Sequence, residues 1–277
     1  MNIKIGFSPC PNDTFIFYGL LKKKIKVDGF TFNEIIKDVE ELNQLAIRGI
    51  PDLTKVSYHT VGLVLDRYCL LRSGGALGRG CGPLIVAREN KTYEEIRKGP
   101  IAVPGRYTTA YLLLWLFDRE LAQRALYMRF DMIMEAVKEG RVSAGLIIHE
   151  GRFTYQQYNL QMLADLGKWW EKETGLPIPL GGIIVRRDLG EENIRRLDLM
   201  IKESIKYAYE HPVELMPFIK GFAQELEEDV IKQHIKLYVN NFSIDIGIEG
   251  QRAVEELLSR AMDSGLIPKS HKKITCL

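Results

Sequence analysis

Short apolar segments alternate with amphipathic helical segments along most of this 277-residue chain. Residues 3–7, 30–36 and 53–56 have the composition of buried strands, and residues 15–22 and 39–47 carry apolar side chains at helical spacing. Strands that alternate with helices in this way predict parallel βαβ units. The chain is therefore expected to adopt an α/β fold.

The alternation of strands and helices continues beyond residue 80, as far as about residue 185. Further strands are expected at residues 83–87, 101–103, 142–148 and 181–185. The remaining expected helices are at residues 60–65, 92–96, 108–118, 131–139, 194–210, 227–238 and 249–262. Residues 70–82 are predicted to be a loop, and the chain after residue 185 is predicted to be mostly helical.

Two of the expected strands, near residues 83–87 and 183–185, are plausible crossovers between domains. The chain would leave a first domain near residue 88, build a second domain, and return near residue 182. We therefore expect a discontinuous first domain of residues 1–88 and 182–277 and a second domain of residues 89–181. Such an arrangement places a cleft between the domains, where small ligands usually bind.

Composition and charge exclude several classes of partner. A hydrophobic fraction of 46% and a charged fraction of 27% are ordinary for a soluble globular protein. The net charge of +2, without a dense basic patch or an acidic tail, gives no reason to expect nucleic acid or an anionic membrane as a partner. No apolar run approaches the roughly 20 residues that span a bilayer. Without a signal-peptide pattern, a cytoplasmic location is expected.

The four cysteines show no recognisable motif. Cys10, Cys69, Cys81 and Cys276 form no CxxC pair, and none has a histidine at the spacing of a zinc site. We expect all four to be reduced thiols of a cytosolic protein, and we expect no metal site.

Polar residues gather in the strand-to-helix turns, here called corners, that follow the first and third expected strands. Ligands of open α/β sheets bind at such carboxyl ends of strands. The first corner contains Asn12 in a loop that two prolines stiffen. At the second corner, Lys55 and Ser57 alternate with Val56, and a lysine beside a hydroxyl suits an anionic or hydroxylated ligand. Helix capping and an ordinary surface lysine remain the alternative interpretations.

A third corner contains Thr108 and Thr109 at the start of an expected helix. The free N–H groups and the positive dipole end of a helix N-terminus favour a carboxylate or a phosphate. Simple N-capping by the threonines is the alternative. The glycine content around this corner is too low for a dinucleotide-binding or P-loop fingerprint, so no nucleotide cofactor is expected.

His149 is the most suggestive single residue, because it follows an apolar strand and precedes Glu150 and Gly151. A histidine at the carboxyl end of a strand can act as a general base near neutral pH. A structural role with satisfied hydrogen bonds is the alternative. The other four histidines are weaker candidates, by their local sequence: His59, His211, His234 and His271.

Four segments resemble, in order, the motifs of the futalosine-pathway 1,4-dihydroxy-6-naphthoate synthases. They are SPCPNDTF at 8–15, DLTKVS at 52–57, VPGR at 103–106 with the threonines that follow, and GLIIHEG at 145–151. The resemblance implies a two-domain fold like that of type-2 periplasmic binding proteins, with a discontinuous first domain and an interdomain cleft. It extends from the first strand to the final helices.

The resemblance also implies an activity. It implies a carbon–carbon lyase of menaquinone biosynthesis that cleaves cyclic dehypoxanthinyl futalosine to 1,4-dihydroxy-6-naphthoate without a metal or a cofactor. His149 would then accept a proton, and Lys55, Val56, Ser57, Thr108 and Thr109 would hold the substrate. A chorismate dehydratase of the same pathway and a non-catalytic solute-binding protein are the alternatives. The sequence makes no prediction of the oligomeric state.

Overall fold

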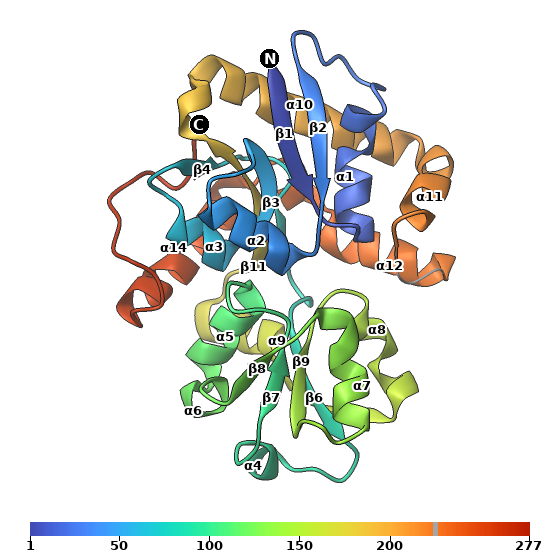
Figure 1. Cartoon of the computed structure of the whole chain (residues 1–277), viewed down its shortest axis with the longest axis vertical. Helices are drawn as coiled ribbons and strands as arrows, with labels where there is room; N and C mark the ends of the chain where they lie inside the picture. The colour runs from blue at the N-terminus through green and yellow to red at the C-terminus, as the bar shows by residue number, and fades with distance from the viewer. Residues whose placement is uncertain (224–226) are drawn as a thin grey trace. The chain divides into compact units, whose positions relative to one another are not determined.

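The computed structural model describes residues 1–223 and 227–277, which form two compact units (Figure 1). Unit 1 comprises Met1–Gly78 and Pro179–Leu277, and unit 2 comprises Arg79–Ile178. Each unit has its own β-sheet and its own helices, which confirms the α/β class that the alternating pattern predicts.

The sheet of unit 1 has the strand order β2-β1-β3-β11-β4, and β5 pairs with β11. Its strands are β1 (Asn2–Phe7), β2 (Thr31–Ile36), β3 (Leu53–Ser57), β4 (Tyr68–Leu70), β5 (Ala76–Gly78) and β11 (Ile178–Arg186). Strand β1 runs parallel to β2 and β3, whereas β11 runs antiparallel to β3 and β4. The carboxyl ends of β1 and β3 therefore lie at the same edge of this sheet.

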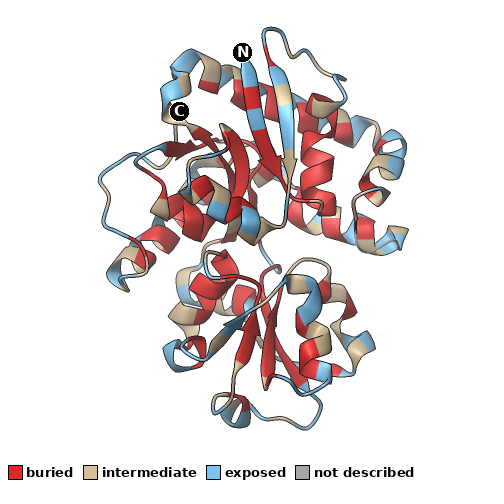
Figure 2. Cartoon of the chain, in the orientation of Figure 1, coloured by how far each residue is buried: buried red, intermediate tan, exposed pale blue. Residues whose placement is uncertain are grey.

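The helices of unit 1 bury the sheet and one another (Figure 2). They are α1 (Pro11–Leu21), α2 (Val39–Ile47), α3 (Tyr58–Leu63), α10 (Glu191–Glu210), α11 (Pro212–Lys220), α12 (Glu228–Tyr238), α13 (Asn241–Ile244) and α14 (Gly247–Asp263), with a 3-10 turn at Arg187–Leu189. Helix α1 is buried from its first residue to its tenth, since β1, α10, α11 and α12 surround it. A helix that is apolar around most of its circumference requires such cover.

Helix α1 is fastened to α10 at one close approach. A Cβ atom on Gly19 would lie only 3.0 Å from Cα of Ser204, so the helices could not approach this closely with a larger residue. The Ser204 hydroxyl donates to the carbonyl of Ile16 at 2.6 Å and accepts from the N–H of Leu20 at 3.1 Å. This contact holds α1, and with it the loop that precedes α1, in one position on unit 1.

The sheet of unit 2 has the order β10-β6-β9-β7-β8. Its strands are β6 (Leu84–Arg88), β7 (Ile101–Val103), β8 (Ala125–Tyr127), β9 (Ala144–Ile147) and β10 (Leu160–Asp165). Strand β7 runs parallel to β8 and β9, and β6 runs antiparallel to β9 and β10. The carboxyl ends of β7 and β9 thus share an edge.

Short helices pack on the sheet of unit 2. They are α4 (Tyr93–Ile96), α5 (Thr109–Phe117), α6 (Arg119–Ala122), α7 (Ile133–Lys138), α8 (Gly151–Thr154) and α9 (Leu166–Thr174), with 3-10 turns at Phe130–Met132 and Tyr155–Tyr158. The start of α4 shows the predicted reciprocal capping between Thr92 and Glu95. The core of unit 2 forms between α7 and the central strands.

The boundaries between the units differ from those that we expected from the sequence. Residues 79–88 belong to unit 2, because β6 pairs with β9 and β10 of the second sheet. Residues 179–181 belong to unit 1, because β11 pairs with β3 from Gly181 onward. The predicted loop at residues 70–82 also contains β5, which adds to the first sheet.

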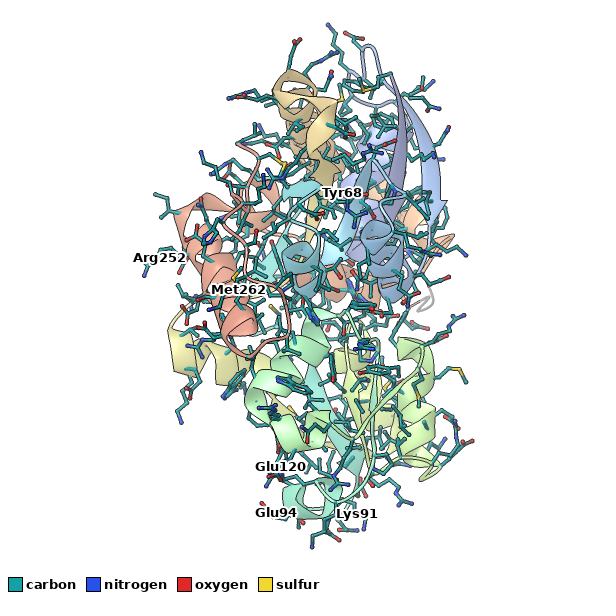
Figure 3. All side chains as sticks on the ribbon, turned by 60° about the vertical axis from the view of Figure 1, so that its left-hand side comes forward. Tyr68, Lys91, Glu94, Glu120, Arg252 and Met262 are labelled. Carbon is teal, nitrogen blue, oxygen red and sulfur yellow. A yellow bond between two sulfur atoms is a disulfide. The ribbon has the colours of Figure 1, made fainter. Side chains whose placement is uncertain are left out.

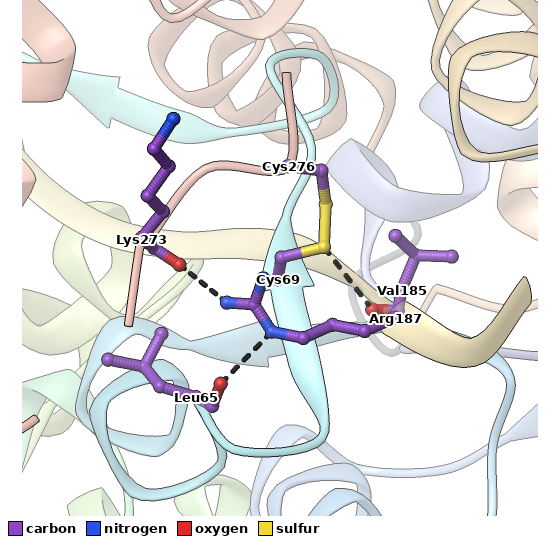
Figure 4. The surroundings of a disulfide bond; sticks show 6 residues. All are labelled: Leu65, Cys69, Val185, Arg187, Lys273 and Cys276. Atoms are coloured by element: carbon purple, nitrogen blue, oxygen red, sulfur yellow. Dashed lines mark hydrogen bonds between the residues drawn. A yellow bond between two sulfur atoms is a disulfide. The ribbon is translucent and has the colours of Figure 1, made fainter. Parts of the chain in front are cut away.

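The expectation of four reduced cysteines is wrong for two of them. Cys69 and Cys276 form a disulfide with a Cα–Cα distance of 5.1 Å (Figure 4). Leu70 forms backbone hydrogen bonds with Ile274 and Cys276, which bring the end of the chain to β4. Cys69 and Cys276 are 207 positions apart in the sequence, so the local spacing of cysteines does not predict this disulfide. Cys10 and Cys81 are not disulfide-bonded, and both are buried.

The surface carries dispersed charges, as the composition predicts. Glu94, Glu120 and Arg252 are exposed, and their side chains extend away from the ribbon (Figure 3). Within residues 1–223 and 227–277, no helix has the length and apolar character that crossing a membrane requires.

Candidate functional site

Two of the three predicted corners meet in unit 1. Asn12 follows β1 at the start of α1, and Lys55, Val56 and Ser57 end the neighbouring strand β3. All four residues are buried, with exposed fractions of 6% for Asn12 and 4% for Lys55. Because β1 and β3 are parallel neighbours, their polar ends lie at one edge of the sheet, where ligands of such sheets bind.

The Asp13 carboxylate links these two corners. Its Oδ2 accepts from the backbone N–H of Ser8 at 3.1 Å and from the Ser8 hydroxyl at 2.7 Å. Its Oδ1 accepts from Nδ2 of Asn12 at 2.9 Å and lies 3.4 Å from Nζ of Lys55. Four partners occupy the roughly four lone-pair sites of a carboxylate. Asp13 therefore organises Asn12 and Lys55 and is poorly suited to accept a proton from a ligand.

The Lys55 ammonium is held on a second side by a backbone carbonyl. Nζ donates to the Gly74 carbonyl at 2.7 Å. Gly74 has φ +76°, and a Cβ atom there would lie 2.1 Å from Cδ1 of Ile183, so only glycine fits this turn. A lysine has three N–H donors, and the two contacts made with described residues leave the third for a ligand oxygen. The surface-lysine interpretation of Lys55 is therefore wrong, because Lys55 is buried and paired.

Ser57 is held by Asn43 of α2. Nδ2 of Asn43 donates to the Ser57 hydroxyl at 3.1 Å, and Oδ1 of Asn43 accepts from the Ser57 backbone N–H at 2.9 Å. Asn43 is fully buried, so this bidentate contact fixes both the backbone and the side chain of Ser57. Val56, between Lys55 and Ser57, is fully buried and can contribute only main-chain groups toward a ligand.

Several residues of this network are not among those predicted from the sequence. Asp13 holds Asn12 and Asn43 holds Ser57, whereas Ser8 holds Asp13. His234, a weak candidate because of the charged sequence around it, is fully buried and contacts Asn12 at 3.0 Å. His234 follows Ile231 by three residues in α12, so both lie on the buried face of this helix. This helical spacing is the feature of the sequence that could have predicted the burial of His234.

The third corner and His149 lie at one edge of the sheet of unit 2. Thr108 and Thr109 follow β7, and His149 follows β9, which is the parallel neighbour of β7. Elsewhere in unit 2, burial raises the pKa of the Cys81 thiol to about 12, so this thiol stays protonated at neutral pH and is not a candidate nucleophile.

Thr108 caps helix α5. Its hydroxyl accepts from the N–H of Tyr111 at 3.2 Å and donates to the Gly105 carbonyl at 2.9 Å. The structural interpretation of the Thr108 side chain is thus confirmed. Thr108 and Thr109 are each only 2% exposed, and Thr109 is the first residue of this nine-residue helix. The N–H groups of the first turn can still attract an anion.

His149 has a left-handed backbone conformation with φ +55°. Such a conformation is uncommon for a residue other than glycine and is found more often at functional sites. The imidazole is half-buried and meets the Phe130 ring edge to face, with 5.0 Å between the ring centroids. Strand β9 ends at Ile147, two residues earlier, so His149 lies in the turn between β9 and α8.

Arg152 fastens the turn that carries His149. Nη1 of Arg152 donates to the Gly82 carbonyl at 2.9 Å, and Nη2 donates to Oδ2 of Asp165 at 2.7 Å. The other oxygen of Asp165 caps α9 by accepting from the N–H groups of Gly167 and Lys168. The side chains of Arg152 and Asp165 are 14% and 5% exposed, so water screens this ion pair weakly.

The two sets of residues offer different chemistry. Unit 1 presents an ammonium, a carboxamide and a hydroxyl, which suit the oxygen atoms of a hydroxylated ligand. Unit 2 presents a helix N-terminus and an imidazole, which suit a carboxylate and a proton transfer. Within either unit taken alone, the described residues contain no cluster of three side chains that could ligate a metal ion.

Comparison with known proteins identifies the family. The model of the family described as "Menaquinone biosynthesis" matches residues 3–263. The chain belongs to this family. This menaquinone biosynthesis protein is 49% identical over 273 residues to the 1,4-dihydroxy-6-naphthoate synthase of Thermus thermophilus, with 98% of both chains covered. It is 45% identical over 270 residues to the Streptomyces coelicolor protein of the same name, covering 96% of this chain and 95% of that one.

Solved structures support the predicted fold of the menaquinone biosynthesis protein. A crystal structure of a protein from Archaeoglobus fulgidus is similar with a TM-score of 0.90 and 34% identity, covering 96% of this chain and 98% of that one. The alkanesulfonate-binding protein SsuA of Xanthomonas axonopodis pv. citri has a TM-score of 0.71 at 13% identity, covering 97% and 94%. The second similarity shows the fold alone and confirms the expected likeness to periplasmic binding proteins.

Proposed function

We propose that this protein is a 1,4-dihydroxy-6-naphthoate synthase, a lyase that cleaves cyclic dehypoxanthinyl futalosine in menaquinone biosynthesis. The observation that carries this proposal is the near-full-length identity of 49% to a relative of that name, within a family of menaquinone biosynthesis. The proposal includes a small-molecule substrate, no nucleic-acid or membrane partner, and a cytoplasmic location that cell fractionation would test.

The proposal assigns the proton transfer to His149. The imidazole lies in a turn at the carboxyl end of β9, and the Arg152 contacts support that turn. General-base catalysis requires such a positioned group. Removal of one proton from the substrate would start a fragmentation that forms the second aromatic ring. The reaction then depends on positioning and desolvation, and no step calls for a metal or a cofactor.

The remaining predicted residues are proposed to bind the substrate. The substrate has an aromatic carboxylate, which suits the N-terminus of α5 at Thr108 and Thr109. It also has a sugar-derived polyol, whose oxygens suit Lys55, Ser57 and Asn12. The fixed orientations of these three side chains support this assignment, because a pre-organised group loses little entropy on binding. Val56 is proposed to contribute its main chain.

One experiment tests the activity. The purified protein is incubated with cyclic dehypoxanthinyl futalosine, and the naphthoate is detected by its mass and its absorbance. Formation of 1,4-dihydroxy-6-naphthoate at a rate proportional to enzyme concentration is the expected result. Recovery of the unchanged compound in a stoichiometric complex would indicate a solute-binding protein instead. Turnover of chorismate, without turnover of the futalosine derivative, would indicate the dehydratase.

A further inference from the structure

A histidine far along the chain contacts the loop that follows β1. His234 on α12 is 0% exposed, and its Nε2 lies 3.0 Å from Oδ1 of Asn12, 222 residues away. The His234 ring also packs against the Tyr238 ring, with 4.7 Å between their centroids. A buried imidazole is costly unless its polar atoms are bonded, so the position of His234 depends on its polar contacts.

The hydrogen-bond network assigns the direction of this contact. Nδ2 of Asn12 faces Oδ1 of Asp13 at 2.9 Å, and a carboxylate oxygen can only accept. The other end of the carboxamide, which faces His234, is therefore the oxygen. Because that oxygen also only accepts, Nε2 of His234 must carry a hydrogen and donate it.

These two bonds orient the Asn12 carboxamide from both ends. An asparagine side chain has a broad, soft terminal torsion, so a single bond would leave its orientation poorly defined. Asp13 holds the amide nitrogen and His234 holds the amide oxygen. Among the described residues, these contacts use one N–H and one lone pair of Asn12. The second N–H and the second lone pair thus have a fixed direction.

We propose that His234 is a positioning residue that orients Asn12 for binding of the substrate. This inference rests on the proposed function, in which Asn12 contacts an oxygen of the substrate. His234 acts through Asn12 and does not touch the substrate itself. Without the His234 donor, the carboxamide can rotate, and its contact with Asp13 and its direction toward the substrate are then lost together.

A double-mutant cycle on the full-length enzyme tests this role. His234→Phe is made in the parent and in the Asn12→Ala variant, and KM and kcat for cyclic dehypoxanthinyl futalosine are measured for all four proteins. We expect His234→Phe to raise KM about 3- to 10-fold in the parent, the size of one neutral hydrogen bond. We expect kcat to change less than about two-fold, because a contact made equally in ground and transition states changes KM alone.

The Asn12→Ala background separates positioning from general destabilisation. If His234 acts through Asn12, His234→Phe has no further effect on KM once the carboxamide is absent. His234→Gln should recover most of the loss, since its terminal amide can place a donor where Nε2 lies. His211→Phe is the matched control, since His211 contacts Tyr207 and belongs to no part of the network; its KM should equal that of the parent.

Several outcomes would overturn the inference. Independent, multiplicative effects of the two substitutions on KM would do so, as would a parent-like KM for Asn12→Ala or for His234→Phe. If His234→Phe does not fold, as judged by thermal melting, His234→Asn replaces it in the same cycle, because its shorter amide cannot reach Asn12. A parent enzyme without turnover contradicts the proposed function, whereas an active parent with multiplicative effects contradicts only the role of His234.

Discussion

At the scale of single residues, His149 combines an imidazole with a left-handed backbone conformation. Asparagine adopts this conformation more readily than most residues, so His149→Asn should preserve the turn while it removes the proposed base. We expect kcat to fall about 10²- to 10⁴-fold, the usual contribution of general-base catalysis. Steady-state kinetics measures the fall, with thermal melting and substrate affinity as controls.

A folded His149→Asn variant that binds substrate and turns over at nearly the parent rate would exclude His149 as the base.

Thr109 and Thr108 allow a paired prediction at the start of α5. If the helix start holds the substrate carboxylate, Thr109→Ala should mainly raise KM, from a few-fold to about a hundred-fold, as expected for loss of a hydrogen bond to a neutral or a charged group. An ester of the substrate carboxylate should lose most of this sensitivity. Equal effects on the acid and on the ester would place the carboxylate elsewhere.

Thr108→Ala is the structural counterpart of this substitution. The Thr108 hydroxyl caps α5, so its loss should lower the free energy of unfolding by about 0.5–2 kcal/mol. Chemical denaturation measures this change. The comparison separates the capping role of the Thr108 hydroxyl from the substrate contact that is proposed for the Thr109 hydroxyl.

At the scale of secondary-structure elements, the β9–α8 turn depends on Arg152. Arg152→Ala removes the bonds to Gly82 and Asp165 and leaves the Asp165 carboxylate without its buried cation. Loss of one partner of a buried pair costs about 3–5 kcal/mol. Since Asp165 keeps its two N–H contacts with α9, we expect a loss near the lower end, measured by urea denaturation.

A surface pair in the same unit supplies the control for this prediction. Arg141 pairs with Glu139, and both side chains are 50% exposed. Arg141→Ala should therefore change the free energy of unfolding by less than about 1 kcal/mol. Equal losses for the two arginine variants would show that the Arg152 contacts contribute no more than a surface pair.

At the scale of the whole molecule, the disulfide ties the end of the chain to β4. A bond between residues 207 positions apart restricts the unfolded chain strongly. Reduction should lower the free energy of unfolding by about 2–4 kcal/mol, measured by denaturation with and without a thiol reductant. Cys276→Ser should show the lower stability in both conditions. A parent protein that is insensitive to the reductant would contradict the prediction.

A second prediction at this scale concerns cofactors. The proposed reaction uses proton transfer and positioning, so activity should survive exhaustive chelation and dialysis. The turnover number before and after treatment with a chelator is the measurement. Activity that is lost on chelation and returns only when a metal ion is added would refute this expectation.

Much of the local structure could be predicted from the sequence. The predicted bounds of α2 and β7 agree with the structure to the residue, and the capping of α4 was predicted as well. Burial periodicity and helix caps are local signals, so a short window contains them. Strands β4, β5, β8 and β10 were not predicted: the first three have only three residues each, and β8 and β10 are not strongly buried.

Local sequence was sufficient to predict the α/β class, the family motifs and the individual corners that carry Asn12, Lys55, Thr109 and His149. The tertiary structure was needed to show which corners share a sheet edge, and that Asp13 and His234 hold the Asn12 side chain. It also decided the disulfide and the assignment of β6 to unit 2. These features depend on contacts between segments far apart in the chain, and such contacts are set by strand order and helix packing, which leave no signal in local spacing.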